Sequence, residues 1–415
     1  MTVSGKTNGR PSAGSVSRRG FLAGASVAAA AVIAPQAARG YQANSKVRIG
    51  LAGCGGRGTW IAGLFQQHGG YELAAVADYF QDRVDRCGEK FGVAPSRRFP
   101  GLKGYQRMLD SGIDALVIES PPYFHPEQAA AGVAAGKHVY VAKPIAVDVP
   151  GCISIEQSGR QATEKGLCFL VDFQTRADQF YIEAIRRVHE GALGDFAFGE
   201  STYHAGIPWV GQAEAAKEAA TNAEARLRAW GVDQVLSGDI ITEQNIHTLD
   251  VASWIMDKPP VCAFGAGGRK VRGYGNCWDT FSVTFQYPDN VGIAFSSRQF
   301  NGHGSQPEGI RNRMFGAKGV LETAYGGDVL IRGENFHRGG SSPAIYKEGA
   351  VANIATFHNS IQAGDCKNPT VAPSVRSNLV TILGRTAAYR GEVVYWENLL
   401  KSTEKLEADL RGLKS

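Results

Sequence analysis

KVRIGLAGCGGRG, residues 46–58, joins an apolar run to a cluster of glycines. Residues 46–52 first alternate polar and apolar side chains and then become apolar, which is typical of a buried strand. The glycines match the spacing G-x-G-x-x-G, and the apolar periodicity over 60–65 predicts a helix directly after them. Such a loop allows a tight turn and lets backbone N–H groups approach a pyrophosphate at the helix N-terminus. We therefore predict that a dinucleotide binds to Gly53, Gly55, Gly56, Arg57 and Gly58.

A second predicted strand, residues 72–77, ends at Asp78. An acid at the end of this strand can accept both ribose hydroxyls of the adenosine, and it would repel a 2′-phosphate. The position of Asp78 therefore favours NAD over NADP. Arg83 lies nearby in the sequence and could weaken that preference.

Two further predicted strands end in polar residues. Residues 113–118 are almost wholly apolar, as in a buried parallel strand, and residues 138–142 form the next one. Ligands of doubly wound sheets bind beyond the carboxyl ends of the strands. We therefore place Ser120, Pro121, His125 and Lys143 in the cofactor site, although His125 could instead only cap the helix that follows it.

The excess charge of the chain lies in its first forty residues. Residues 1–40 hold five of the 44 Lys and Arg residues and none of the 39 Asp and Glu residues. The remainder is neutral, so it predicts no nucleic-acid partner. Arg18 and Arg19 precede an apolar run over 22–34, which is too short for a membrane span of about 20 residues and is typical of a signal peptide. The paired arginines resemble the twin-arginine export signal, so we expect export of the folded protein to the periplasm.

Length and pattern predict two domains after this signal. We expect a signal peptide over 1–40, a doubly wound parallel Rossmann domain over 41–165, and an α+β domain over 166–415. In the last of these, residues 280–287 and 291–296 read as a β-hairpin within an open, mainly antiparallel sheet. Seven scattered cysteines without a Cys-x-x-Cys pair predict neither a disulfide framework nor a zinc site.

Four motifs, in the same order along the chain, give a family resemblance. Residues 135–144 (AGKHVYVAKP) resemble the A-G-K-H-V-x-x-E-K-P signature of the Gfo/Idh/MocA family of NAD(P)-dependent oxidoreductases. Residues 120–125 resemble its T-P-x-x-x-H loop, residues 172–176 its G-F-Q-x-R segment, and residues 238–250 its G-x-L-x-D-x-G-x-H-x-x-D helix. Ala142 departs from the family, which has Glu there, and Glu243 stands where the family has Asp. The resemblance implies a substrate-binding second domain whose sheet often makes the oligomer contact, so we expect a homo-oligomer.

The residues of these motifs suit hydride transfer at a carbinol carbon. Glu243 and His247 are four residues apart on the expected helix and would share one face, although such pairs also occur as ordinary surface pairs. His247 suits the acid/base role, and Lys143 would donate to the substrate oxygen. The resemblance assigns the matching lysine and histidine the same roles. We expect Glu243, Arg176 and His204 to contact a sugar, and we predict no metal, since Glu243 and His247 lack an evident third ligand.

These observations favour an exported oxidoreductase that acts on a sugar or polyol. Nicotinamide is not expected as a free pool outside the cytoplasm, so NAD should stay tightly bound between half-reactions. One alternative is an NAD-dependent glycoside hydrolase that oxidises, eliminates, adds water and returns the hydride, with Glu243, His204 or Tyr203 as the extra base. A second alternative is a non-catalytic binding protein, against which the retention of Lys143 and His247 argues.

Overall fold

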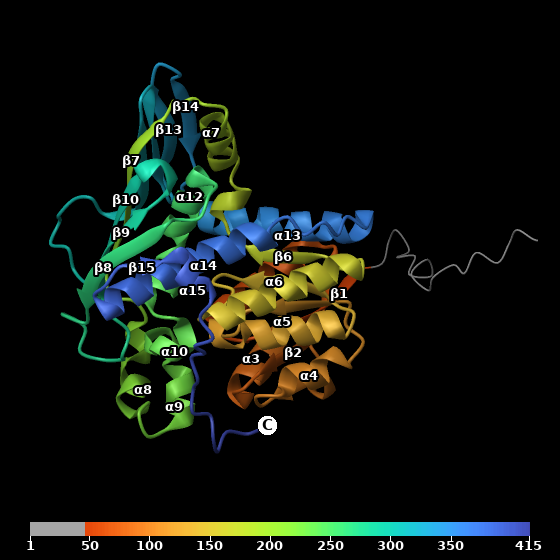
Figure 1. The fold of residues 1–415 in the computed structure, drawn as a ribbon. Helices are drawn as coiled ribbons and strands as arrows, with labels where there is room; N and C mark the ends of the chain where they lie inside the picture. Colours follow the sequence, from red (N-terminus) through yellow and green to blue (C-terminus); the bar gives the residue numbers. More distant parts are fainter. Residues whose placement is uncertain (1–45) are drawn as a thin grey trace, which may run out of the picture. The chain divides into compact units, whose positions relative to one another are not determined.

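Six parallel strands form the first sheet of the structure, a computed structural model that describes residues 46–415 (Figure 1). The strand order is β3-β2-β1-β4-β5-β6, the doubly wound order of a Rossmann fold, so the predicted fold class of this half is confirmed. The strands are β1 (Val47–Ala52), β2 (Tyr71–Asp78), β3 (Arg98–Pro100), β4 (Ala115–Ile118), β5 (His138–Ala142) and β6 (Phe169–Asp172). The predicted signal segment, residues 1–40, lies outside the described residues.

The last strand of this sheet lies beyond the domain boundary that we expected at residue 165. Strand β6 begins after residue 165, yet it pairs in parallel with β5, with Ala142 opposite Asp172. Strand β4 is buried at every position, because helices cover both faces of a doubly wound sheet. These helices are α2 (Gly56–His68), α3 (Gln81–Phe91), α4 (Gly104–Leu109), α5 (His125–Ala134) and α6 (Val149–Glu164).

Nine strands form the second sheet, in the order β14-β13-β12-β11-β7-β10-β9-β8-β15. Within the described part of this second sheet only the β7–β10 pair is parallel, so the expected open, mainly antiparallel sheet is confirmed. The predicted hairpin is present as β9 and β10. The strands are β7 (Phe196–Ala205), β8 (Cys262–Gly268), β9 (Thr280–Gln286), β10 (Gly292–Gln299), β11 (Gly309–Gly316), β12 (Gly319–Ala324), β13 (Asp328–Gly333), β14 (His337–Ser341) and β15 (Val394–Tyr395).

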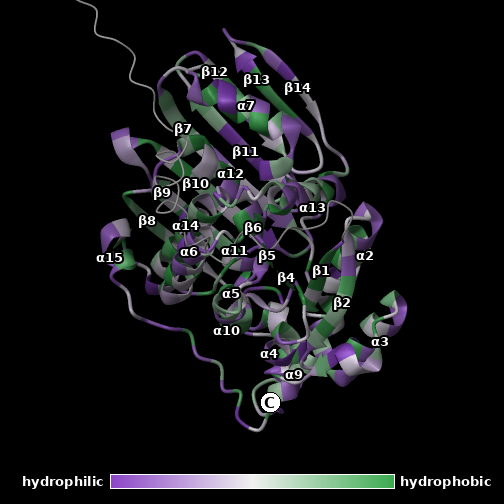
Figure 2. Ribbon diagram, turned by 90° about the vertical axis from the view of Figure 1, so that its right-hand side faces the viewer, coloured by the Kyte–Doolittle hydropathy of each residue, from purple (hydrophilic) through white to green (hydrophobic). Residues whose placement is uncertain are grey.

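Helices of the second half cover one face of this sheet and also reach the first one. Helices α7, α12 and α14 pack on the strands, while α13 contacts α2 and α14 contacts α6. A smaller group, α8 to α10, lies apart from the sheet (Figure 1), and Figure 2 also shows α9 beside the chain's C-terminus. The helices are α7 (Gln179–His189), α8 (Ala213–Glu218), α9 (Ala223–Arg228), α10 (Gln234–Ser237), α11 (Ile240–Glu243), α12 (Ile246–Met256), α13 (Ile345–Ala363), α14 (Val371–Arg390) and α15 (Trp396–Leu400).

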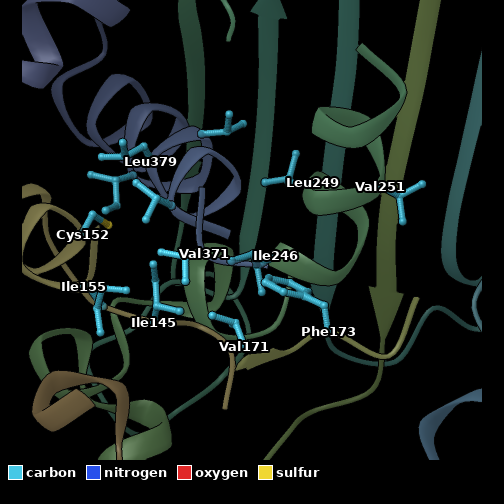
Figure 3. Close-up of a cluster of buried hydrophobic side chains, with 14 of the residues drawn as sticks. Ile145, Cys152, Ile155, Val171, Phe173, Ile246, Leu249, Val251, Val371 and Leu379 are labelled. Carbon is cyan, nitrogen blue, oxygen red and sulfur yellow. The ribbon is translucent and has the colours of Figure 1, made fainter. Parts of the chain in front are cut away.

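One hydrophobic core joins the two halves. Figure 3 shows side chains of α6, β6, α12 and α14 meeting, among them Ile155, Val171, Leu249 and Leu379. All four are buried. Burial of apolar surface between the two sheets therefore fixes α12, which follows the first sheet by more than seventy residues, close to the ends of β5 and β6.

Candidate active site

The glycine-rich loop between β1 and α2 has the geometry that a pyrophosphate requires. Gly53 has φ +100°, and a Cβ there would lie 2.5 Å from the backbone of Glu119. A Cβ at Gly58 would lie 1.8 Å from the carbonyl oxygen of Gly53, so a side chain at either position would collide with backbone. Gly55 and Gly56 face open space at the start of α2, where no side chain of the described residues caps the helix. An anion at this N-terminus would be stabilised by the free N–H groups and the helix dipole.

Asp78 lies beside this loop, at the end of β2. Its Oδ2 accepts the backbone N–H of Cys54 at 2.8 Å and its Oδ1 accepts that of Phe80 at 3.0 Å. Burial raises the pKa of the carboxyl. Asp78 lines a pocket open to solvent, together with Gly53, Ser120, Pro121 and the other residues Ala52, Ala77, Tyr79, Phe80, Arg83, Gly101, Leu102, Tyr105, Phe124, Gln128 and Leu227. The place and lining of this pocket fit an adenosine.

The guanidinium of Arg57 is paired with two buried carboxylates. Its Nε lies 3.0 Å from Glu119 Oε2, and its Nη2 lies 2.5 Å from Asp172 Oδ2. The side chains of both carboxylates have no exposed surface, and burial raises the pKa of Glu119 to about 7. Arg57 therefore joins the start of α2 to the ends of β4 and β6.

The two carboxylates flank the position where the sequence lacks one. Ala142 pairs with Asp172 across β5 and β6, and Glu119 follows β4 on the other side of β5. Their strands thus place two acids beside the residue that the family pattern has as Glu. Sequence reasoning missed this arrangement, although the signal was present, because each acid directly follows a run of apolar strand residues.

Lys143 follows β5 and reaches the second half of the chain. Its Nζ donates to the backbone oxygen of Glu243 at 2.6 Å and lies 3.4 Å from Glu243 Oε1. Burial lowers the pKa of Lys143, and the neighbouring Arg57 lowers it further, while Glu243 acts in the opposite direction. The side chains of Lys143 and Glu243 are 10% and 11% exposed, so this charged pair is almost enclosed.

His125 supports the segment around Lys143. It is the first residue of α5 and is buried. Its Nδ1 lies 2.8 Å from the Pro144 oxygen and its Nε2 lies 2.7 Å from the Ser120 oxygen. Burial lowers the pKa of His125 to about 4, although both carbonyls favour the protonated ring. His125 therefore ties the β4 end to the β5 end.

Glu243 and His247 are near each other, but the expectation of one continuous helix is wrong. Glu243 is the last residue of α11 and His247 is the second residue of α12. Between them the Asn245 N–H bonds to the Ile240 oxygen and the His247 N–H bonds to the Gln244 oxygen, which replaces the regular i to i−4 pattern. The break leaves the Glu243 carbonyl free to accept from Lys143.

Unpartnered polar atoms surround His247. Among the described residues, His247 Nδ1, both amide atoms of Asn245 and the Tyr325 hydroxyl are buried without a hydrogen-bond partner. The rings of His247 and Tyr325 are 5.3 Å apart. Burial lowers the pKa of His247 well below its ordinary value, and Lys143 and Arg57 add to this. Buried polar groups are normally satisfied, so this cluster is suited to bind a ligand with several hydroxyls.

Two of the predicted substrate residues lie elsewhere. Arg176 forms a two-pronged ion pair with Asp250 and lies over the ring of Trp254. His204 Nε2 lies 3.0 Å from Ser296 Oγ, on the face of β7 opposite to Tyr203. The structure therefore does not bring Arg176 or His204 into the group formed by Lys143, Glu243 and His247. In Tyr203, the residue next to His204, burial and the Glu243 carboxylate raise the pKa of the hydroxyl.

No group of three or more His, Cys, Asp or Glu side chains between residues 46 and 415 has a geometry that could hold a metal ion. In the same part of the chain, no helix has the length and hydropathy that a membrane crossing requires.

Comparison with known families gave two adjacent matches. The family described as "Oxidoreductase family, NAD-binding Rossmann fold" matches residues 47–173, and the GFO/IDH/MocA C-terminal domain matches residues 181–322.

The individual relatives carry the names of two kinds of carbohydrate enzyme. The α-N-acetylgalactosaminidase of Shewanella oneidensis is 28% identical over 169 residues, 39% of this chain and 36% of that protein. The chain thus spans little more than a third of the length of this relative. The myo-inositol 2-dehydrogenase of Thermotoga maritima is 23% identical over 82% of this chain and 95% of that protein. Among solved structures, the apo scyllo-inositol dehydrogenase from Lactobacillus casei has a TM-score of 0.64 at 21% identity and covers 85% of this chain and 99% of its own, which indicates a shared fold.

Proposed function

Because the chain belongs to the Gfo/Idh/MocA family of NAD-binding oxidoreductases, we propose that it transfers a hydride between a carbon of a sugar or polyol and NAD. The observation that carries this proposal is the contact of Lys143, from the first sheet, with Glu243, which lies four residues before His247 in the second half of the chain. The segments that carry Lys143 and Glu243 meet at the end of β5, next to the strand ends where the dinucleotide fits.

The cofactor's part of the chemistry is hydride exchange at its nicotinamide ring. The chain's own residues that would hold it are the loop Gly53–Gly58 at the pyrophosphate and Asp78 at the adenosine ribose. The fit rests on the open space at Gly55 and Gly56 and on the backbone contacts that a Cβ at Gly53 or Gly58 would break. Asp78 would repel a 2′-phosphate whereas Arg83, in the same pocket, would attract one, so we infer NAD as the main cofactor with some tolerance of NADP.

Lys143 has the position and a free N–H donor to stabilise the substrate oxygen. An ammonium group has three N–H donors, and one of them is directed at the Glu243 carbonyl at 2.6 Å. A second faces Oε1 of the same residue at 3.4 Å, which leaves a donor for the substrate. In an enclosed site such a preorganised positive charge stabilises an oxyanion more than it would in water.

His247 supplies the base. Its lowered pKa keeps the imidazole neutral at neutral pH, and Nδ1 lacks a protein partner. During oxidation Nδ1 would take the hydroxyl proton of the substrate, and during reduction it would return that proton. Asn245 and Tyr325 would bind further hydroxyls, which favours a polyhydroxylated substrate.

We further propose that the protein is exported through the twin-arginine pathway with NAD already bound. The support is Arg18 and Arg19 before the apolar run over 22–34. A cofactor that stays bound needs a second substrate to restore its redox state, so we propose a cycle in which one sugar is oxidised and another carbonyl compound is reduced.

The second candidate is redox-neutral glycoside hydrolysis. It is favoured by two relatives, one named as a family 109 glycosyl hydrolase and one as an α-N-acetylgalactosaminidase, which each match 39% of the chain. Cleavage of a nitrophenyl glycoside without added cofactor or acceptor would establish this alternative. Absence of cleavage across several sugars, the α-N-acetylgalactosaminide included, would exclude it.

The main proposal is tested with Lys143→Ala. We expect kcat/KM for polyol oxidation to fall by a factor of about 10² to 10³, while the amount of NAD that copurifies stays the same. Lys137→Ala is the matched control, because Lys137 precedes the same strand at its other end and bonds to the Ile113 oxygen. Unchanged turnover in Lys143→Ala, or a bound nucleotide that no sugar reduces, would overturn the proposal.

A further inference from the structure

The pocket that fits the adenosine includes one residue from far outside the first sheet. All of its lining lies between Ala52 and Gln128 apart from Leu227, which belongs to α9. Leu227 is only 4% exposed and packs in a small cluster with Phe80 and Leu236. A segment of the second half therefore forms part of the wall at the adenine end.

Contacts on both sides of Leu227 bind α9 to residues 79–82, which follow β2. The Tyr79 hydroxyl donates to Glu224 Oε1 at 2.7 Å. The Arg228 guanidinium lies 3.8 Å from the ring centre of Phe80 and 3.2 Å from Asp82 Oδ1. Tyr79 and Phe80 directly follow Asp78, and Asp82 is the second residue of α3, so α9 is bound to the segment that would surround the adenine.

The C-terminal tail, residues 402–415, covers the same region from another side. Figures 1 and 2 both show the C-terminus beside α9. The Leu102 N–H donates to the Lys414 oxygen at 3.0 Å, the Lys414 N–H lies 3.4 Å from the Tyr79 hydroxyl, and the Leu406 N–H donates to Asp148 Oδ2 at 2.8 Å. Leu410 and Leu413 pack against the cluster around Phe80. Tyr79 thus contacts both α9 and the tail.

We propose that residues 222–237 and 402–415 form a clasp that closes the adenine end of the dinucleotide site and retards exchange of the cofactor. The inference rests on the proposed NAD-dependent function and gives it a physical basis for cofactor retention. A dinucleotide with its ribose at Asp78 has its adenine between Phe80, Leu102 and Leu227, so it leaves only when the clasp opens. The clasp lies away from Lys143 and His247, where the substrate would enter, and it therefore separates cofactor exchange from substrate exchange.

The test measures NADH exchange by stopped-flow fluorescence in three proteins. One ends at Ser402, which removes tail residues that do not line the pocket. The second is Glu224→Ala with Arg228→Ala, which removes the contacts of α9 with Tyr79, Phe80 and Asp82 and leaves the tail and the pocket lining unchanged. The control is Arg332→Ala, which breaks an exposed ion pair with Glu322 on the second sheet. We expect release and association each to become at least about tenfold faster in the first two proteins, because an opened barrier accelerates both directions.

Three results would overturn the clasp. Exchange rates within twofold of the parent in both variants would show that neither segment obstructs the cofactor. Faster release with unchanged association would mark lost contacts and not a barrier. A parent protein that binds neither NAD nor NADH would overturn the proposed function, and the clasp with it. Thermal unfolding of nucleotide-free protein checks that each variant is folded, and the two variants act on different segments, so the failure of one to fold leaves the other decisive.

Discussion

Arg57 is the second residue of α2, at the N-terminus that would face a pyrophosphate. Its positive charge is nevertheless paired with two buried carboxylates. Its guanidinium lies against Glu119 and Asp172, whose side chains are wholly buried. Removing one partner of a buried ion pair leaves an uncompensated charge, which costs about 3–5 kcal/mol. We expect Arg57→Ala to lower the free energy of unfolding by that amount at pH 8, measured by urea denaturation.

The pH dependence of this loss identifies its cause. The pKa of Glu119 is raised to about 7 by burial, and it would rise further without Arg57, so protonation of Glu119 relieves part of the penalty as the pH falls. The loss should therefore be smaller at pH 5.5 than at pH 8. Arg332→Ala, on the exposed surface, should change stability by under about 0.5 kcal/mol at either pH. An Arg57→Ala penalty that is independent of pH would contradict this account.

Lys143 and His247 set the limits of the pH profile. Burial lowers the pKa of His247 below its ordinary value, so the base form is present at neutral pH and is lost only as the pH falls through that lowered pKa. Burial also lowers the pKa of Lys143, so its proton is lost before the ordinary lysine range is reached. We expect kcat/KM for polyol oxidation to be bell-shaped, with midpoints below about pH 6.5 and below about pH 10.5.

A substitution separates the two limbs of this profile. Arginine stays protonated across the accessible range, so Lys143→Arg should lose the alkaline limb and retain the acid one. An acid midpoint above pH 6.5, or an alkaline limb that persists in Lys143→Arg, would show that other groups control the reaction.

At the scale of elements, the local patterns predicted more than the connections between them. Apolar runs and glycine spacing located β1, β4 and the start of α2, because a buried strand and a tight turn are determined by neighbouring residues. The break between α11 and α12 was not predicted, since it depends on how α12 packs against α14 and the second sheet. The pairing of Arg57 with Asp172 joins residues 115 positions apart, and no local pattern reports such a contact.

The outer face of the second sheet predicts self-association. Its central strands expose small side chains such as Ala294 and Thr284. Two larger apolar side chains, Phe198 and Phe264, are 45% and 52% exposed. Small side chains let a second sheet approach to about 10 Å. We expect a homo-oligomer in solution, detected by light scattering, which Ala294→Arg dissociates. Lys318→Ala, in the turn between β11 and β12, is the control, and a parent that is monomeric at micromolar concentration would contradict the prediction.

At the scale of the whole chain, the site is assembled from separate segments. The first sheet supplies the glycine loop, Asp78 and Lys143, and the second half supplies Glu243, His247 and the clasp. The glycine spacing and the strand end at Asp78 predicted the cofactor residues from sequence, and the family motifs predicted Lys143, Glu243 and His247. Residues 222–237 and 402–415 belong to none of those motifs, so their part in the cofactor site emerged only from the fold.

The neutral body and the basic first forty residues lead to the last prediction, which concerns destination. Twin-arginine export accepts folded protein, and a clasp that retains NAD would let the cofactor travel with it. We expect the full chain to reach the periplasm with NAD bound, and Arg18→Lys with Arg19→Lys to hold it in the cytoplasm at equal NAD occupancy. Cell fractionation followed by nucleotide analysis measures both quantities, with Arg10→Lys as the control outside the arginine pair. Normal export of the double variant would exclude this pathway, and nucleotide-free protein in the periplasm would show that the cofactor does not travel with the chain.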